Sequence, residues 1–364
     1  METLVLPVTP ATLATAAVMV LGFVAALFVG AILLPGLERE GYPQPDGTRR
    51  TYKLTGMTLF FLTHIVLGVA TIRFGVTLTP ILSHFWSILI VANAIAVIAT
   101  VALFVRGRRR GARRAGASTL KELWMGSELN PTWLGVDLKM FLYQPSLIGV
   151  YLVVLSFAYA QRDLHGTITP QMACLVAFWF AYLFTHYVKE EFMLSTWDIL
   201  SENLGFMLVW GDLVYVPFLY SLPGWWLVDR VAPYSTLQWA SLSTFFAVAL
   251  WIFRDANWQK ERFKRDRGVA IWGRPAETVG GSLLVSGWWG VARKINYAGE
   301  IGVYVAFAAT AGAVSIVPYL LPLSLLVLLT QRAARDDRKC RAKYGDLWRE
   351  YCARVRYRIF PFVY

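Results

Sequence analysis

Two clusters of polar and aromatic residues near the C-terminal end contain the side chains best suited to chemistry. The first is LLVSGWWGVARKINYAGE (Leu283–Glu300), and the second, ARDDRKCRAKYGDLWREYCARVRYRIFPFVY (Ala334–Tyr364), ends the sequence. Four polar side chains stand close together in the first cluster: Arg293, Lys294, Asn296 and Tyr297. Cations, aromatic faces and amides in one place suit a large anionic ligand with a ring system. We therefore predict a cofactor site.

A basic stretch before the first cluster offers further cations. In NWQKERFKRDR (Asn257–Arg267), Lys260 and Lys264 are four residues apart, so a helix would point both the same way. Two cations on one face suit phosphate groups, and a solvated cytoplasmic loop is the alternative. In the tail, a single helix would align four residues spaced by four, four and seven positions: Asp336, Cys340, Tyr344 and Tyr351. This stripe suits a ribose and a stacked base, or equally the packing of that helix on a membrane domain.

A carboxylate also lies inside an otherwise apolar stretch. Asp212 occurs in STWDILSENLGFMLVWGDLVYVPFLYSL (Ser195–Leu222), so it must face protein, water or a ligand rather than lipid. A paired aspartate that only holds helices together is the structural alternative. Nearby, His186 and two glutamates resemble metal ligands in type. Their spacing matches no metal motif, and we predict no metal site.

The elements that position these residues are apolar segments. Hydrophobic residues make up 57% and charged residues 16% of the 364, and the mean hydropathy is +0.49, which indicates a polytopic helical membrane protein. The net charge of +12 is concentrated between apolar segments, for example as six arginines in Arg106–Arg114, which favours cytoplasmic loops over a nucleic-acid surface. The three cysteines have no metal or CxxC spacing, so we expect no disulfide framework.

We expect an all-α fold with nine to ten transmembrane helices and a cofactor pocket on the cytoplasmic side near the C-terminus. Nine apolar segments occur at 11–34, 54–78, 81–105, 145–160, 169–188, 204–228, 236–253, 298–314 and 315–330. With Leu283–Trp289 as half of a broken helix, the number becomes ten. Basic loops on the inside place the N-terminus outside and the C-terminus in the cytoplasm. We expect one integral domain over residues 1–364, with N-terminal helices in 1–190 and the ligand-binding half in 191–364.

Seven stretches of this sequence resemble the sterol reductase family. This family includes the C14, C7 and C24(28) sterol reductases and the membrane domain of the lamin B receptor. The stretches are PDGTRRTYKLTG, GSELNP, WDILSENLGFMLVWGDLVYVPFLYSL, ANWQKERFKRD, LLVSGWWGVARKINYAGE, RAARDDRKCRAKYGDLWREYC and YRIFPFVY, in the family's order. They span most of the sequence. Departures include Lys294-Ile295 where the family usually has His-Pro, Lys264 in place of arginine and Gln331 in place of histidine.

The resemblance implies NADPH-dependent reduction of a sterol double bond, with ten passes. C14 or C7 of the ring system is favoured, and C24(28) of the side chain is the alternative. The resemblance also implies that NADPH contacts a set of residues in the basic stretch and in the two clusters. We add Arg293 to this set because it belongs to the first cluster. The set is Lys260, Lys264, Leu284, Trp289, Asn296, Tyr297, Asp336, Cys340, Arg341, Lys343, Tyr344 and Tyr351.

Reduction of an isolated alkene requires protonation before hydride transfer, and so an acid within an apolar pocket. Burial can keep a carboxyl group protonated. The candidates are Asp212, Tyr215, Glu202 and Tyr351. The partners would be a sterol and membrane lipid, without nucleic acid. The location would be the endoplasmic reticulum in a eukaryote or the inner membrane in a bacterium.

Two rival functions remain. An isoprenylcysteine carboxyl methyltransferase-like enzyme would share a basic-Asn/Pro-Tyr-x-Gly element and a tyrosine-rich tail, but would bind S-adenosylmethionine. Such enzymes are shorter, and they do not account for WDILSENLGFMLVWGD. A non-catalytic sterol-binding scaffold would retain the fold, but the intact cofactor set argues against it.

Overall fold

The computed structural model describes residues 4–44, 47–112, 116, 118–230 and 233–363. Four residues of the motifs discussed above lie outside these ranges, namely Pro45, Asp46, Arg113 and Arg114, as does the terminal Tyr364. The chain forms two compact units, Met1–Val231 and Ala232–Tyr364, which we describe separately. The expected single domain with halves meeting at residue 190 stays a prediction.

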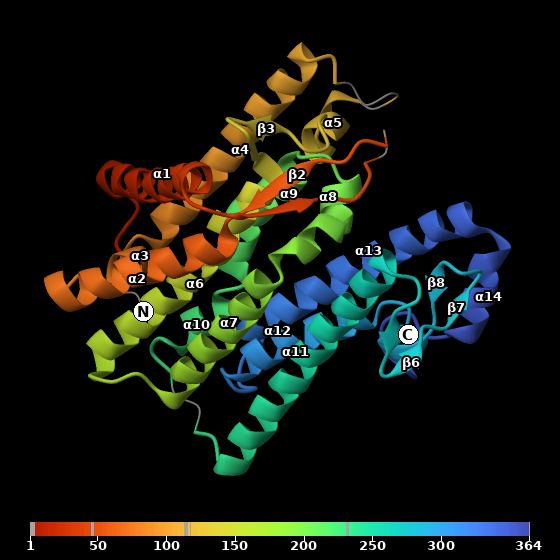
Figure 1. The fold of residues 1–364 in the computed structure, drawn as a ribbon. Helices are drawn as coiled ribbons and strands as arrows, with labels where there is room; N and C mark the ends of the chain where they lie inside the picture. Colours follow the sequence, from red (N-terminus) through yellow and green to blue (C-terminus); the bar gives the residue numbers. More distant parts are fainter. Residues whose placement is uncertain (1–3, 45–46, 113–115, 117, 231–232, 364) are drawn as a thin grey trace. The chain divides into compact units, whose positions relative to one another are not determined.

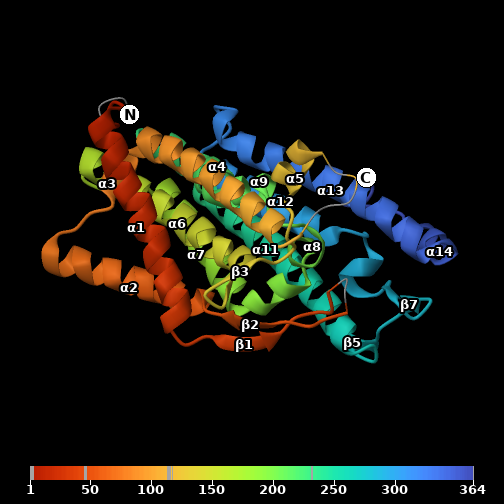
Figure 2. The ribbon, with the colours of Figure 1, turned by 90° about the horizontal axis from the view of Figure 1, so that it is seen from above.

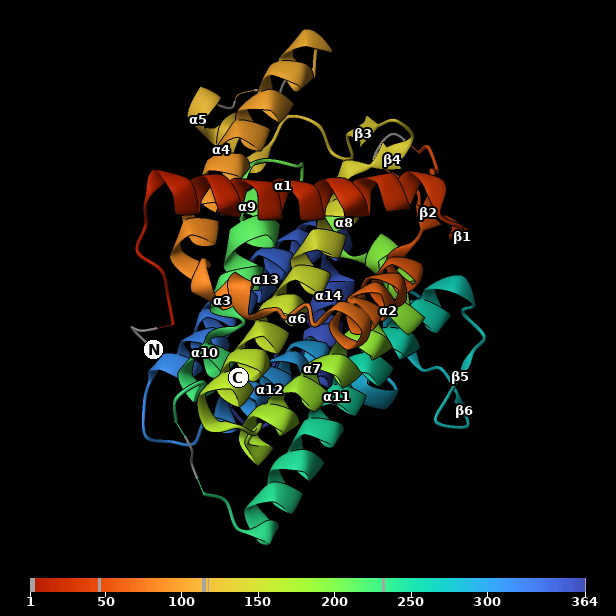
Figure 3. The same cartoon turned by 90° about the vertical axis from the view of Figure 1, so that its left-hand side faces the viewer.

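The first unit is built around one long helix, α6 (Leu138–His165), most of whose side chains are buried. Helix α6 contacts the other major helices of the unit: α1 (Pro10–Leu33), α2 (Gly56–Phe74), α7 (Pro170–Val188) and the segment from α9 (Phe206–Trp210) through η2 (Gly211–Leu219) to α10 (Leu222–Leu227). Helix α4 (Phe85–Arg109) packs on α1, α9 and η2. Figure 3 shows α1 lying across α4 and α6.

Short elements connect these helices. The hairpin β1 (Leu37–Glu40) with β2 (Thr51–Leu54) joins α1 to α2, as Figure 2 shows. The pair β3 (Thr132–Trp133) with β4 (Val136–Asp137) precedes α6 (Figure 3). Asp137 caps α6, because its Oδ1 accepts the N–H groups of Lys139 and Met140 at 3.0 Å each. The remaining short helices are α3 (Thr79–Ser83), α5 (Thr119–Met125), η1 (Glu190–Ser195) and α8 (Trp197–Ser201).

The second unit is built from helices α11 (Thr236–Arg265), α12 (Ile295–Ala309) and α13 (Leu320–Tyr344) and a lobe of short elements, which Figure 1 shows. Helix α12 packs between α11 and α13. A Cβ atom on Gly299 would lie 2.6 Å from the backbone nitrogen of Phe253, so glycine permits the close approach of α12 to α11. The lobe contains β5 (Ala270–Ile271), β6 (Arg274–Pro275), β7 (Thr278–Val279), β8 (Leu283–Leu284), η3 (Gly287–Gly290) and α14 (Asp346–Arg354); η4 (Val317–Tyr319) precedes α13.

The all-α membrane architecture is confirmed. Within the described residues, eight helices are long and apolar enough to cross a membrane. The expected apolar segments at 298–314 and 315–330 correspond to α12 and the start of α13, which pack on each other, although α12 has only 15 residues. The expected half-helix at Leu283–Trp289 is wrong: it is a short strand followed by a 3₁₀ turn, because Gly287 adopts a positive φ of 61°.

The expectation of one helix carrying Asp336 through Tyr351 is also wrong. Helix α13 ends at Tyr344 and α14 begins at Asp346. Gly345 separates them with φ 55° and ψ −119°, a conformation that residues with a Cβ rarely adopt. Only Asp336, Cys340 and Tyr344 share a helix.

Candidate functional site

In the second unit, the two tryptophans of the GWWG turn are fixed to one face of α11. The indole of Trp289 donates to the carbonyl of Ala256 at 2.8 Å, and that of Trp288 donates to Asp255 at 2.8 Å. The side chain of Gln259 accepts the backbone N–H of Trp288. A Cβ atom on Gly287 would lie 2.2 Å from the Oε1 of Gln259, so the turn requires glycine at this position.

Cations gather beside this turn. The prediction that Lys260 and Lys264 share a face is confirmed, because both lie in the last turns of the unbroken helix α11. The ammonium group of Lys260 lies 4.6 Å from the ring centroid of Trp289, and Lys260 is within electrostatic range of Lys264 and Lys294. Leu284 and Trp289 belong to one buried cluster. The arrangement joins an aromatic face to several positive charges, which suits an anionic ligand with a ring.

Lys294 forms an ion pair with Asp336, which brings the two sequence clusters together. Both side chains are largely buried, with 13% and 17% of their surfaces exposed. Burial alone would lower the pKa of Lys294, but the Asp336 carboxylate reverses this effect, and the pKa lies above its ordinary value. Lys294 therefore stays charged at neutral pH. The thiol of Cys340 is 3.8 Å from the same carboxylate.

Asn296 offers a free hydrogen-bond acceptor beside these charges. Its Nδ2 donates to the side chain of Asn257 on α11 at 3.2 Å, whereas its Oδ1 is buried without a partner among the described residues. Tyr297 is the next residue, in the first turn of α12. A buried amide oxygen without a partner is costly unless a ligand or water donates to it. Asn296 is thus well suited to bind a ligand with N–H or O–H groups.

Other predicted cofactor residues have different surroundings. Arg293 is buried, and its Nη1 donates to the carbonyls of Val355 and Arg356 at 2.6 and 2.9 Å, which attaches the tail to the start of α12. Arg341 pairs with Asp337 at 3.3 Å and is 70% exposed on its side chain. The exposed Lys343 lies over the ring of Tyr344. These three side chains are engaged in packing or face solvent.

Tyr351 reaches the same region from α14. It is buried with Trp348, and Cys340 and Tyr344 of α13 pack against this cluster together with Cys352. Burial raises the pKa of Tyr351, so its hydroxyl group stays protonated at neutral pH. The turn at Gly345 therefore places Tyr351 beside Cys340 and Tyr344 without a shared helix.

In the first unit, Asp212 lies in a π-helical segment, Gly211–Leu219, that interrupts the span from 206 to 227. Its side chain is buried, Ser146 of α6 interacts with it, and no ion pair joins it to a cation among the described residues. π-helical turns are rare and often occur at functional sites. Tyr215 is half-buried in the same segment, with its ring 6.0 Å from that of Trp210.

The residues before this segment are held by Lys139 and by the GSELNP loop. Lys139 is fully buried, and its ammonium group donates to the carbonyls of Asp198 and Glu202 at 2.6 Å each. The carboxylate of Glu202 accepts the indole N–H of Trp197 at 2.6 Å. Gly205 meets Gly126 so closely that a Cβ atom on Gly205 would lie 2.1 Å from the backbone nitrogen of Gly126.

Two residues of these sites, Lys294 and Lys139, were not singled out from the sequence. Lys294 was noticed only as part of a cluster, although a lysine where the family usually has histidine was a usable signal. Lys139 gave no signal at all, because nothing local indicates that its ammonium group binds carbonyls about sixty residues away.

Comparison with known proteins adds an independent line of support. The model of the "Ergosterol biosynthesis ERG4/ERG24 family" matches residues 4–364. A Delta(14)-sterol reductase of Arabidopsis thaliana is 35% identical over 345 residues, covering 93% of each chain. A Delta(14)-sterol reductase of Methylotuvimicrobium alcaliphilum is 35% identical over 94% of this chain and 83% of its own. A probable 7-dehydrocholesterol reductase of Acanthamoeba polyphaga mimivirus is 30% identical over 90% of this chain and 75% of its own.

Proposed function

The chain belongs to the ergosterol biosynthesis ERG4/ERG24 family, and on that premise we propose that it reduces the C14 double bond of a sterol with NADPH. The observation that carries this proposal is similarity along almost the whole length to relatives named Delta(14)-sterol reductase. The relative named for 7-dehydrocholesterol makes C7 the second candidate. The eight apolar helices support a membrane enzyme with a lipid-soluble substrate.

The residues around Trp289 support NADPH as the reductant. Lys294 supplies positive charge, Lys260 places a second basic group over Trp289, and the Trp289 ring supplies a flat aromatic surface. The Oδ1 of Asn296 has no partner among the described residues and can accept from an amide or a hydroxyl group. Lys264 extends the positive surface by one helical turn. NADPH, when bound, supplies hydride. The chain itself must bind the phosphates, orient the ring and exclude water.

We propose Asp212 as the proton source, with Tyr215, Glu202 and Tyr351 as the other candidates. The carboxyl group of Asp212 is buried in a membrane span and has no cationic partner among the described residues. Glu202 is less suited, because its Oε1 already accepts a short hydrogen bond from Trp197. In this scheme the carboxyl group of Asp212 would donate its proton to one alkene carbon, and NADPH, held by the residues around Trp289, would supply the hydride for the other carbon.

The test is turnover of Δ14, Δ7 and Δ24(28) sterols by the purified protein with NADPH, followed by mass spectrometry. The expected product is the Δ14-reduced sterol. NADPH should bind more tightly than NADH or S-adenosylmethionine in calorimetry. Preferred binding of S-adenosylmethionine would support the methyltransferase alternative, and sterol binding without turnover of any substrate would support the scaffold.

Asp212→Asn tests the proton source separately. Loss of one positioned acid should reduce kcat by about 100-fold or more, while the Kd for NADPH stays unchanged. Asp163→Asn is the matched control, since Asp163 is an exposed carboxylate near the end of α6. Turnover of Asp212→Asn at the wild-type rate would exclude Asp212 as the donor. Loss of sterol binding, NADPH binding and thermal stability together would indicate that Asp212 is only structural.

A further inference from the structure

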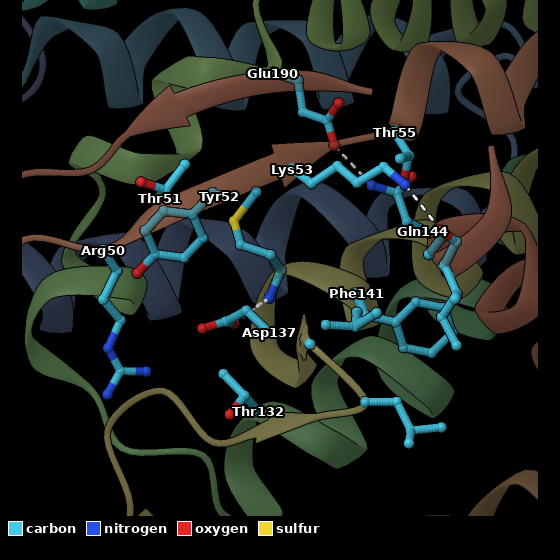
Figure 4. A pocket seen from close by; sticks show the side chains of 16 residues that line it. Arg50, Thr51, Tyr52, Lys53, Thr55, Thr132, Asp137, Phe141, Gln144 and Glu190 are labelled. Carbon is cyan, nitrogen blue, oxygen red and sulfur yellow. Dashed lines mark hydrogen bonds between the residues drawn. The ribbon is translucent and has the colours of Figure 1, made fainter. Parts of the chain in front are cut away.

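A polar cavity in the first unit is lined by none of the proposed cofactor-binding or proton-donor residues (Figure 4). Its volume is about 270 Å³. Two basic and two acidic side chains line it, together with apolar residues from α1, α6 and the turn between β3 and β4. The four charged residues are Arg50, Lys53, Asp137 and Glu190. Arg50 and Lys53 can pair with an anionic group and Asp137 with a cationic one, so the lining offers partners to both charges of a zwitterion.

The cavity lies where four candidate membrane helices end or begin. Residues 31 and 32 lie near the end of α1, Thr55 directly precedes α2, residues 140 to 144 are in the first turns of α6, and Glu190 follows the end of α7. Two helices end here and two begin here, so all four ends belong to the same face of the membrane layer. The cavity is therefore at the level of lipid headgroups.

Aromatic residues beside the cavity also indicate that it lies at the level of the lipid headgroups. Trp133 is 60% exposed and stacks on Phe28, with ring centroids 5.2 Å apart. Phe28 in turn contacts Phe141, which lines the cavity. Exposed tryptophans are enriched at membrane–water interfaces, where the ring meets both headgroups and apolar chains.

One side of the cavity pairs a guanidinium group with a free carboxylate oxygen (Figure 4). Asp137 uses Oδ1 to cap α6, whereas its Oδ2 is buried without a partner among the described residues. Arg50 donates one N–H to the carbonyl of Asn130 at 2.5 Å, and no ion pair is formed by Arg50 in the described part of the chain. Its other N–H groups remain available to an anion.

The other side pairs an ammonium group with a free amide oxygen (Figure 4). Lys53 donates to the carbonyl of Ile32 at 2.9 Å and forms no ion pair with a described residue. Gln144 donates from Nε2 to Glu190 at 2.7 Å, but its Oε1 is buried and has no partner in the part of the chain that the structure describes. Gln144 is only 4% exposed, so this oxygen needs a donor from within the cavity.

We propose that this cavity binds the headgroup of a phospholipid with a primary ammonium group, of the phosphatidylethanolamine class. The ammonium group has three N–H donors for the unpartnered oxygens of Asp137 and Gln144. The phosphate carries the negative charge that Arg50 and Lys53 can pair with. A choline headgroup has no N–H donor, and a phosphatidylglycerol headgroup has only neutral O–H donors and no positive charge for the Asp137 carboxylate.

The apolar part of the lining favours a lipid over a soluble zwitterion. Ile32, Leu134 and Met140 line the same cavity as the charged groups. A free phosphoethanolamine molecule would leave this apolar surface uncovered, whereas the glycerol and first acyl carbons of a lipid would cover it. The proposal is independent of the reductase activity, because none of these residues belongs to the proposed cofactor or proton-donor set.

The experiment is a lipid titration of the delipidated, full-length protein, followed by native mass spectrometry. Phosphatidylethanolamine, phosphatidylcholine and phosphatidylglycerol are compared with identical acyl chains, and free phosphoethanolamine forms a fourth arm. We expect phosphatidylethanolamine to bind about tenfold more tightly than the other three, the effect of losing one charge-assisted hydrogen bond. Equal binding of ethanolamine and choline lipids, or tighter binding of phosphatidylglycerol or free phosphoethanolamine, would overturn the proposal.

Two variants and a control locate the binding. Asp137→Asn retains a capping oxygen for α6 but replaces the free acceptor with an N–H donor, so it should remove most of the preference for ethanolamine. Lys53→Ala should weaken phosphatidylethanolamine by about tenfold through loss of a phosphate contact. Arg49→Ala is the control, because Arg49 neighbours Arg50 but pairs with Glu40 outside the cavity. An unchanged headgroup preference in Asp137→Asn together with an unchanged affinity for phosphatidylethanolamine in Lys53→Ala would show that the lipid binds elsewhere.

Discussion

Glu190 provides a sharp test of the physical reasoning applied to the first unit. Its carboxyl group is buried between three helices, accepting the backbone N–H of Gly56 at 2.9 Å and the amide of Gln144 at 2.7 Å. Burial raises the pKa of Glu190 from 4.5 to about 7, more than the two hydrogen bonds lower it. The perturbation is Glu190→Gln. The new side chain keeps an acceptor for Gly56, and its amide can donate to the unpartnered Oε1 of Gln144 after that amide rotates.

The sign and size of the effect follow from proton linkage. Between pH 4.5 and pH 7 the folded protein keeps the Glu190 proton while the unfolded chain releases it, so wild-type stability falls as pH rises. Well above pH 7 the buried Glu190 carboxylate lowers the free energy of unfolding by a constant amount of about 3 kcal/mol. Glutamine does not titrate, so it makes no pH-dependent contribution to the free energy of unfolding. The free energy of unfolding of Glu190→Gln relative to wild type should therefore rise by about 2 to 3 kcal/mol from pH 5 to pH 8.

The assay is unfolding in mixed micelles, followed by tryptophan fluorescence at several pH values. The variant-minus-wild-type difference removes the titration of all other groups. Glu191→Gln is the control with the opposite expectation, because Glu191 pairs with Arg39 at 2.7 Å and its loss should reduce stability at pH 8 by about 1 kcal/mol or less. A stability difference for Glu190→Gln that is the same at pH 5 and pH 8 would refute the raised pKa.

Three further expectations concern other parts of the chain. Lys294→Met and Asp336→Asn should each weaken NADPH at least tenfold in calorimetry, and the double variant should lose less than the product of the two effects because the residues form one ion pair. Independent effects would contradict their coupling. Gly205→Ala should lower the free energy of unfolding by about 2 kcal/mol or more, since its Cβ would meet the Gly126 backbone at 2.1 Å, whereas Gly22→Ala, with open space around it, should not. Cysteines introduced at the exposed Arg110 and Lys343 should be labelled from the same side of the membrane, and labelling from opposite sides would reject the expected topology.

Features that depend on local pattern could be predicted from the sequence. The long apolar segments became helices because membrane spans need about 20 apolar residues in a row, a property that any window of the sequence reveals. The alignment of Lys260 and Lys264 followed from helical periodicity alone. The convergence of the two C-terminal clusters was also foreseeable, since a helical hairpin connects them.

Features that depend on one backbone angle or on distant partners could not be predicted. The sequence did not show that Gly345 ends a helix. The regular spacing from Asp336 to Tyr351 therefore predicted one continuous helix, whereas the structure has two. The π-helical turns at Asp212 have no periodic signature in a short apolar segment. Nothing in the sequence marked Glu190 as a buried carboxyl group, because its partners come from α2 and α6 and are more than forty residues away.

The motif residues divide into two groups once their contacts are known. Arg293 stands in the motif that suggested the cofactor site, yet its guanidinium group binds the carbonyls of Val355 and Arg356. Gly299 permits the close approach of two backbones. Such residues would be retained in a scaffold that had lost its ligand. Asn296 differs, because its buried Oδ1 has no partner within the described protein and is costly unless something donates to it. A motif match therefore supports the fold, whereas buried polar atoms left without protein partners are the stronger argument that a ligand belongs there.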